Sequence, residues 1–80
     1  LNLWVQQNGR CAISGVLLTH HKDGTGAKDF NASLDRINNN KGYTKNNVHL
    51  VCYRVNLLKH TLPSDMFYWW IKTICQHSCD

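Results

Sequence analysis

An acidic and an amide side chain occur at a spacing that suits a metal site. Asp35 lies in an apolar alternation over residues 33–37, and Asn56 follows 21 residues later (56 − 35 = 21). Carboxylate and amide oxygens are hard ligands of the kind that Mg²⁺ takes while it keeps several waters. A divalent cation between these ligands and a phosphodiester would neutralise the charge that develops during hydrolysis. Asp35 and Asn56 are therefore candidate ligands of Mg²⁺ or Mn²⁺.

A hairpin followed by a helix is the unit that would bring these two side chains together. The segment "VHLVC", residues 48–52, alternates in the manner of a strand, as residues 33–37 do. A polar, glycine-containing stretch, "NNNKGYTKNN", separates the two segments, which indicates a hairpin. Helical spacing resumes at residue 53, so Asp35 is expected on the first strand and Asn56 in the first turns of the helix.

Further helices are expected at the two ends of the chain. A short helix should end near Gly9, and residues 20–32 have the composition of a loop. After Pro63, residues of about 64–76 carry an apolar stripe at helical spacing, which predicts a C-terminal helix packed on the core. The residues expected in that core are Met66, Phe67, Trp69 and Trp70.

Length and composition predict one small α+β domain spanning residues 1–80. Hydrophobic residues make up 42% of the chain, so composition does not indicate disorder. Eighty residues give a core near the lower limit for unaided folding, and a metal ion or a disulfide would help to stabilise it.

The charge balance favours a polyanionic partner. Nine basic residues against five acidic ones give a net charge of +4, and the isoelectric point is about 9.1. This balance moves the expectation towards nucleic acid without identifying it. No apolar run is long enough to cross a membrane and no signal peptide is visible, so an intracellular protein without a membrane partner is expected.

The order of motifs resembles a known nuclease family. The pattern "SLDRI…GY…NVHLVC…VN..K" is similar to the ββα-metal core of HNH endonucleases, and "NGRCAISG" resembles the segment that leads into it. The resemblance covers residues of about 6–60 and implies a DNA endonuclease with a hairpin–helix core. It implies that Asp35 and Asn56 hold the metal, that Asn47 ties the hairpin together, and that Lys59 approaches the phosphate backbone.

The chain departs from the family at the general base. Family members carry a histidine after the aspartate, and this chain carries Arg36, which keeps its proton at working pH. Arg36 is suited instead to binding a phosphate through its planar donor face. The resemblance to a rarer subgroup with an Asp-Arg pair implies Tyr43 as the base, and His20, His21 and His49 are competing candidates.

Basic residues around the hairpin are the expected contacts to double-stranded DNA. They are Arg36, Lys41, Lys45 and Lys59.

The four cysteines suggest either a zinc site or buried apolar packing. They are Cys11, Cys52, Cys75 and Cys79. Zinc-binding members of the resembled family have two C-x-x-C pairs, whereas Ser14 and Val55 take the second places here. Cys75 and Cys79 could complete a four-thiolate zinc site with the other two, but scattered thiols also serve as core residues.

Structural interpretations stay open beside the catalytic ones. Asp35 could brace the hairpin turn, Tyr43 could cover it, and Lys59 could be a surface charge. His20 and His21 lie in a charged loop, where histidines are usually solvated. At the level of function, the alternatives to an endonuclease are a nucleic-acid-binding module that has lost cleavage and a zinc-stabilised interaction domain.

Overall fold

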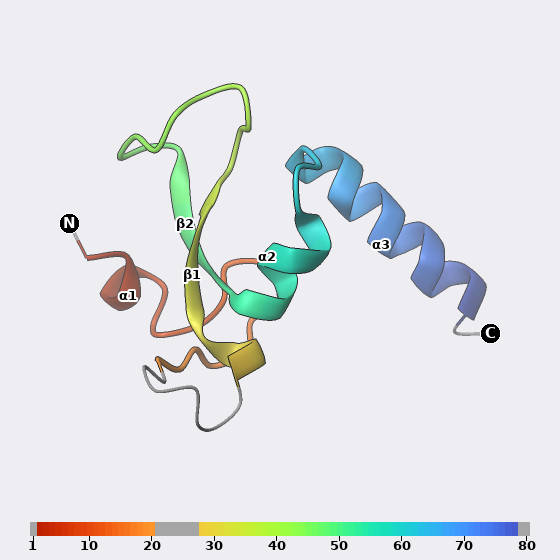
Figure 1. Cartoon of the computed structure of the whole chain (residues 1–80). Coiled ribbons are helices and arrows are strands. Elements are labelled where there is room, and N and C mark those ends of the chain that lie inside the picture. Colours follow the sequence, from red (N-terminus) through yellow and green to blue (C-terminus); the bar gives the residue numbers. More distant parts are fainter. Residues whose placement is uncertain (1, 21–27, 79–80) are drawn as a thin grey trace.

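A two-stranded hairpin that runs into a helix forms the centre of the fold (Figure 1). The computed structural model describes residues 2–20 and 28–78. The elements in chain order are α1 (Leu3–Gln6), the 3₁₀ turn η1 (Lys28–Phe30), β1 (Ala32–Arg36), β2 (Val48–Cys52), α2 (Tyr53–Lys59) and α3 (Ser64–Ser78). The α+β class, the hairpin and the helices on its C-terminal side agree with the expectation from the sequence.

The register of the hairpin decides which side chains meet. β1 and β2 are antiparallel, and Asp35 pairs directly with His49. Because side chains alternate along a strand, Ser33 and Asp35 lie on one face of β1 and Arg36 lies on the other. The first face is covered by α2, since Asn56 contacts Ser33 and Lys59 contacts Asp35.

The long loop between the strands is organised by one buried amide. Asn47 accepts a hydrogen bond at Oδ1 from the backbone N–H of Asn38, at 2.8 Å. Its Nδ2 donates to the carbonyl oxygens of Asn38 and Gly42, both at 2.9 Å. These bonds satisfy backbone groups that a loop of this length otherwise leaves to water. Asn47 therefore ties the loop together, which is the role that the resemblance implies for it.

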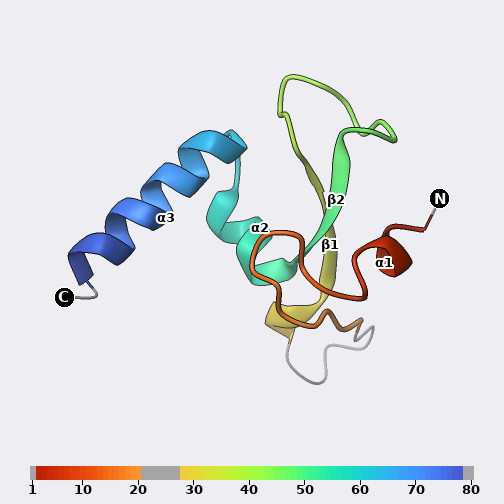
Figure 2. The same ribbon diagram turned by 180° about the vertical axis from the view of Figure 1, so that it is seen from behind.

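The buried core lies between the hairpin and the N-terminal segment. Cys11, Leu18, Val51 and Cys52 form it, with Trp4 packed at its edge. The Gln7 side chain extends the hairpin on that side, because it bonds to both the N–H and the C=O of Leu50. In both ribbon views α1 and α2 flank the hairpin on opposite sides (Figures 1 and 2).

The prediction for the aromatic residues of α3 is largely wrong. Phe67 is buried as expected, but Trp69 is 55% exposed, and Met66 and Trp70 are exposed as well. α2 has seven residues and α3 has fifteen, which correspond to lengths of about 10 Å and about 22 Å. α3 is thus about twice as long as α2, and its C-terminal end lies away from the hairpin in Figure 1.

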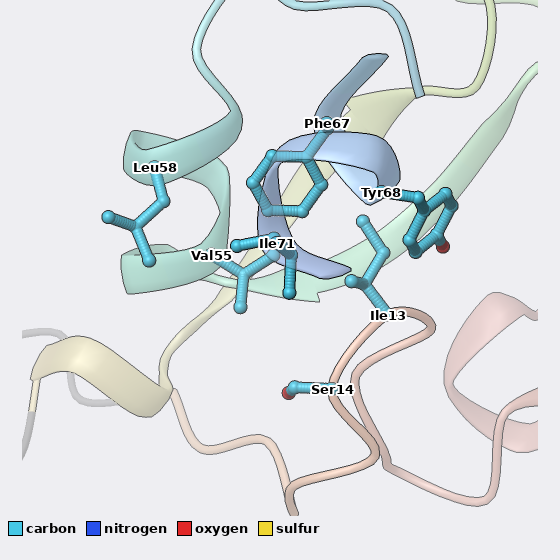
Figure 3. A pocket seen from close by; sticks show the side chains of 7 residues that line it. All are labelled: Ile13, Ser14, Val55, Leu58, Phe67, Tyr68 and Ile71. Atoms are coloured by element: carbon cyan, nitrogen blue, oxygen red, sulfur yellow. The ribbon is translucent and has the colours of Figure 1, made fainter. Parts of the chain in front are cut away.

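Phe67 is the residue that anchors α3 to the rest of the protein. It lines an apolar cavity of about 290 Å³ together with residues from α2 and from the turn after Cys11 (Figure 3). The others are Ile13, Ser14, Val55, Leu58, Tyr68 and Ile71.

Across residues 2–20 and 28–78, none of the helices combines the length and the apolar character that crossing a membrane requires.

Candidate active site and nucleic-acid interface

Asp35 is the centre of a buried charged cluster at the hairpin–α2 interface. The residue is 5% exposed. Its Oδ1 accepts from Nζ of Lys59 at 3.1 Å, and its Oδ2 lies 2.8 Å from Nε2 of His49. His49 meets Asp35 because the two residues pair across the hairpin, and Lys59 reaches it from the last turn of α2. The three residues form what we call the Asp35 cluster.

Lys59 does not occupy the position that the sequence suggested. Its side chain is fully buried, and its ammonium group donates both to Asp35 and to the carbonyl oxygen of Arg36, at 3.2 Å. A lysine in this position has no surface from which to contact a phosphate backbone. The expected DNA contact through Lys59 is therefore wrong, and the structure assigns the ammonium to the hairpin–helix interface. A buried carboxylate and a buried ammonium each compensate the charge of the other.

The arrangement does not fit a divalent cation held by Asp35 and Asn56. Both oxygens of Asp35 already accept hydrogen bonds, and the Lys59 ammonium repels a second cation at the same carboxylate. Asn56 is directed at Ser33, to whose Oγ its Nδ2 donates at 2.7 Å. Among the described residues, no group of three or more histidine, cysteine, aspartate or glutamate side chains is placed to hold a metal.

His49 combines a carboxylate partner with access to solvent. Its side chain is 17% exposed, against 6% for that of Asp35. A carboxylate accepts hydrogen bonds, so Nε2 of a neutral His49 carries the proton and Nδ1 carries the lone pair. The hydrogen bond of the ring is made by Nε2, and no buried side-chain nitrogen or oxygen of the described residues lacks a partner, so Nδ1 is not fully buried. This is the arrangement in which an imidazole can accept a proton.

Arg36 and Tyr43 form a second cluster on the opposite face of the hairpin. The guanidinium carbon of Arg36 lies 5.1 Å from the centre of the Tyr43 ring, and Nη1 of Arg36 donates to the carbonyl oxygen of Lys41 at 3.4 Å. Tyr43 is 65% exposed. This geometry favours a packing role for the ring over the role of general base, because the phenol and Asp35 belong to different faces.

The loop that carries this second cluster is the most cationic exposed surface of the hairpin. Lys41 and Lys45 are both exposed, and they flank Tyr43 in the chain. A loop with three cations and an exposed aromatic ring offers both electrostatic attraction to phosphates and a face for stacking. The expected DNA contact through Arg36, Lys41 and Lys45 stays a prediction, and the loop has the surface for it.

Of the two remaining candidate bases, the structure describes His20 alone, and His20 joins neither cluster. His20 is exposed and packs edge-on against Trp4, with the ring centres 5.5 Å apart. His21 lies outside the described residues.

The cysteines divide between the core and the periphery. Cys11 and Cys52 are buried together, Cys75 is exposed on α3, and Cys79 lies outside the described residues. The second positions of the C-x-x-C pairs, Ser14 and Val55, line the apolar cavity beside Phe67 (Figure 3). The described part of the chain thus holds two of the four thiols in the core, and zinc binding stays a prediction.

Polar groups around Cys11 favour its ionised form. Burial raises the pKa of the thiol, but hydrogen bonds from Ser14, through its side chain and its backbone, lower it. Backbone N–H groups of Cys52 and Ile13 add to the lowering, and the pKa of Cys11 lies below its ordinary value as a result.

Comparison of the chain with protein-family models, curated proteins and solved structures finds no match.

Proposed function

We propose that this chain is a DNA endonuclease domain of the HNH type, which binds double-stranded DNA through the hairpin loop and hydrolyses phosphodiesters beside it. The observation that carries the proposal is the Asp35–His49 pair at 2.8 Å. It lies at the junction of hairpin and helix, where the resemblance to HNH nucleases locates the catalytic centre. A histidine oriented by a carboxylate is a recurrent proton acceptor in hydrolysis.

Binding is supported by the loop surface and by the overall charge. Arg36 lies over the exposed ring of Tyr43, and the exposed Lys41 and Lys45 flank this tyrosine in the chain. The whole chain has a net charge of +4. Cations that neutralise phosphates release counterions, and this release drives association with DNA of any sequence. The loop can therefore bind the DNA backbone, and the asparagine side chains at its two ends hold it in one conformation.

The metal that the resemblance implies has no role assigned in this proposal. In the arrangement described above, Asp35 is fully engaged by Lys59 and His49, and Asn56 is engaged by Ser33. What the chain itself contributes is backbone binding by the loop and a proton acceptor at the Asp35 cluster.

A second candidate function is DNA binding without cleavage. Two observations favour it: the Asp35 carboxylate is held by a buried lysine, and Arg36 faces away from it. An aspartate in such a pair is typical of structural ion pairs as well as of active sites.

Cleavage of supercoiled plasmid separates the two candidates. The purified protein is incubated with plasmid in Mg²⁺, in Mn²⁺ and in EDTA, and binding to a duplex of the same sequence is measured in parallel. We expect nicked or linear product, with a rate that falls by roughly a hundredfold or more in Asp35→Asn. Asp65→Asn, at an exposed position on α3, is the matched control and should cleave as the wild type does. Tight binding with intact plasmid under every condition would favour the binding module.

A further inference from the structure

We propose that His49 accepts the proton of the attacking water through Nδ1, and that Lys59 and Asp35 are the positioning residues that hold its ring. This inference rests on the proposed endonuclease function and names the group that replaces the histidine missing after Asp35. In this proposal Asp35 orients the imidazole of His49, and its two oxygens are engaged by Lys59 and His49 in place of a metal ion.

The positioning begins at the buried end of the cluster. The ammonium of Lys59 donates to Oδ1 of Asp35 and to the backbone carbonyl of Arg36, so two points on β1 fix it. Oδ2 of the same carboxylate is then directed at His49, which faces it across the strand pair. The carboxylate cannot rotate without breaking its bond to a fully buried cation, and breaking such a bond is costly.

The imidazole at the outer end of the cluster has the required tautomer. A carboxylate that is already paired with an ammonium is an acceptor only, so it selects the tautomer that carries its proton on Nε2. The lone pair of Nδ1 is then free to accept a proton, on a ring that is partly exposed and at an atom that is not fully buried. The other described histidines lack a carboxylate partner of this kind: His20 packs on Trp4, and His49 is the one histidine in the ion pairs of the described residues.

The chemical step needs only water and the phosphodiester. An O–H bond of water breaks as its proton moves to Nδ1 of His49, and the oxygen forms a bond to phosphorus. The bond from phosphorus to one ester oxygen breaks with its electron pair, and that oxygen takes up a proton from solvent. The proton on Nδ1 is then lost to solvent, which restores the neutral ring.

The tautomer of His49 is the first test, and it does not depend on cleavage. Long-range ¹H–¹⁵N correlation spectra of the protein alone, at mildly alkaline pH, distinguish a protonated Nε2 from a protonated Nδ1. We expect the Nε2–H form in the wild type. In Asp35→Asn, the Lys59 ammonium should keep the amide oxygen as its acceptor, which leaves the amide NH₂ facing the His49 ring. Because an NH₂ group donates, Nε2 must then accept, and His49 should change to the Nδ1–H form. A wild-type ring protonated on Nδ1 would overturn the proposal.

The second test is chemical rescue of the reaction. His49→Ala should cleave plasmid roughly a hundred- to ten-thousandfold more slowly than the wild type, and added imidazole should restore part of the rate. His77→Ala, at an exposed position on α3, should cleave normally and show no response to imidazole. Cleavage by His49→Ala at the wild-type rate would overturn the assignment of the base and leave the endonuclease function standing. A wild type that never cleaves would instead overturn the endonuclease function itself.

Discussion

At the scale of single residues, the molecule depends on a cation that has no contact with water. Lys59 is fully buried, and its partner Asp35 is nearly so. Such a pair adds little net stability over well-packed apolar residues, but the loss of one member leaves an uncompensated charge in the interior. The pair therefore makes the attachment of α2 to β1 specific, since only this packing satisfies both groups.

Lys59→Met should destabilise the domain severely. The change keeps the length of the side chain and removes the charge, so Asp35 retains only His49 as a partner. We expect the free energy of unfolding by urea to fall by about 3–5 kcal/mol. The double variant Asp35→Asn/Lys59→Met should lose less than the sum of the two single variants, because no lone charge remains. Additive losses in that cycle, or a loss as small as that of the exposed control Lys72→Met, would contradict the pairing.

Cys11 should make stability depend on pH. Its pKa is lowered in the folded protein, so its contribution is present above the unfolded value and is lost as pH falls through the folded pKa. The free energy of unfolding should therefore rise with pH from the lowered folded pKa up to the ordinary value of 9.0. Urea unfolding under reducing conditions should show that Cys11→Ser lacks this rise, whereas Cys75→Ser, at an exposed position, retains it. Parallel pH curves for the wild type and Cys11→Ser would refute the effect.

Sequence reasoning singled out Asp35 but did not predict its contacts with His49 and Lys59. Asp35 and Asn47 stand out because a carboxylate and an amide in a hairpin need specific bonds. The contact with Lys59 was missed, although Asn56 and Lys59 are three residues apart and so share one face of α2. Placing Asn56 towards β1 already implies that Lys59 faces β1 too. Whether its ammonium is buried depends on how closely α2 packs, which no local pattern specifies.

At the scale of elements, the two faces of the hairpin carry two different clusters of side chains. One face carries the Asp35 cluster under α2, and the other carries Arg36, which lies over Tyr43 in the loop. The sequence predicted the strands and the loop well, because alternation and turn composition are local signals. It did not exclude a joint role of Asp35 and Arg36 at one site. Consecutive residues of a strand point to opposite faces, so the strand pattern alone could have ruled out a joint role of these two residues.

The loop should account for the salt dependence of DNA binding. Each phosphate contact that is lost should reduce the slope of log affinity against log salt by about 0.9 for duplex DNA. We expect this reduction in Arg36→Ala, Lys41→Ala and Lys45→Ala, measured by fluorescence anisotropy with a labelled duplex. Lys72→Ala, on exposed α3, removes the same charge elsewhere and should leave the slope unchanged. Equal slopes in all four variants would mean that the loop does not bind the backbone.

At the scale of the whole molecule, α3 is held by one buried aromatic residue and by bonds near its start. Ser64 donates from Oγ to the carbonyl oxygen of Ile37, and Asn39 donates from Nδ2 to that of Thr61. These bonds connect the start of the hairpin loop to the first residue of α3 and to the segment that precedes it. Beyond Phe67 the helix exposes Trp69, Trp70 and Ile74. The sequence could not reveal this exposure, because an apolar stripe shows that a face is suited to burial but not that an element covers it.

Phe67→Ala should detach most of α3. An isolated helix of fifteen residues is marginal in water, so α3 depends on its anchor in the cavity. We expect a loss of helical circular dichroism and a fall in the free energy of unfolding of about 3–5 kcal/mol. Trp69→Ala is the control, because Trp69 is exposed on another side of the same helix. It should change the free energy of unfolding by about 0.5 kcal/mol or less. Retention of full helicity by Phe67→Ala would show that other contacts hold α3.

The alternation along β1 also restricts how the chain can misfold. A strand displaced by one residue exchanges its two faces. In β1, such a slip would turn Asp35 outward and bring either Leu34 or Arg36 under α2, opposite the buried ammonium of Lys59. Leucine would leave that ammonium without a counter-charge, and arginine would add a second cation to it. The same lysine therefore destabilises both misaligned hairpins. Its buried ammonium favours the native register of the two strands while the domain folds.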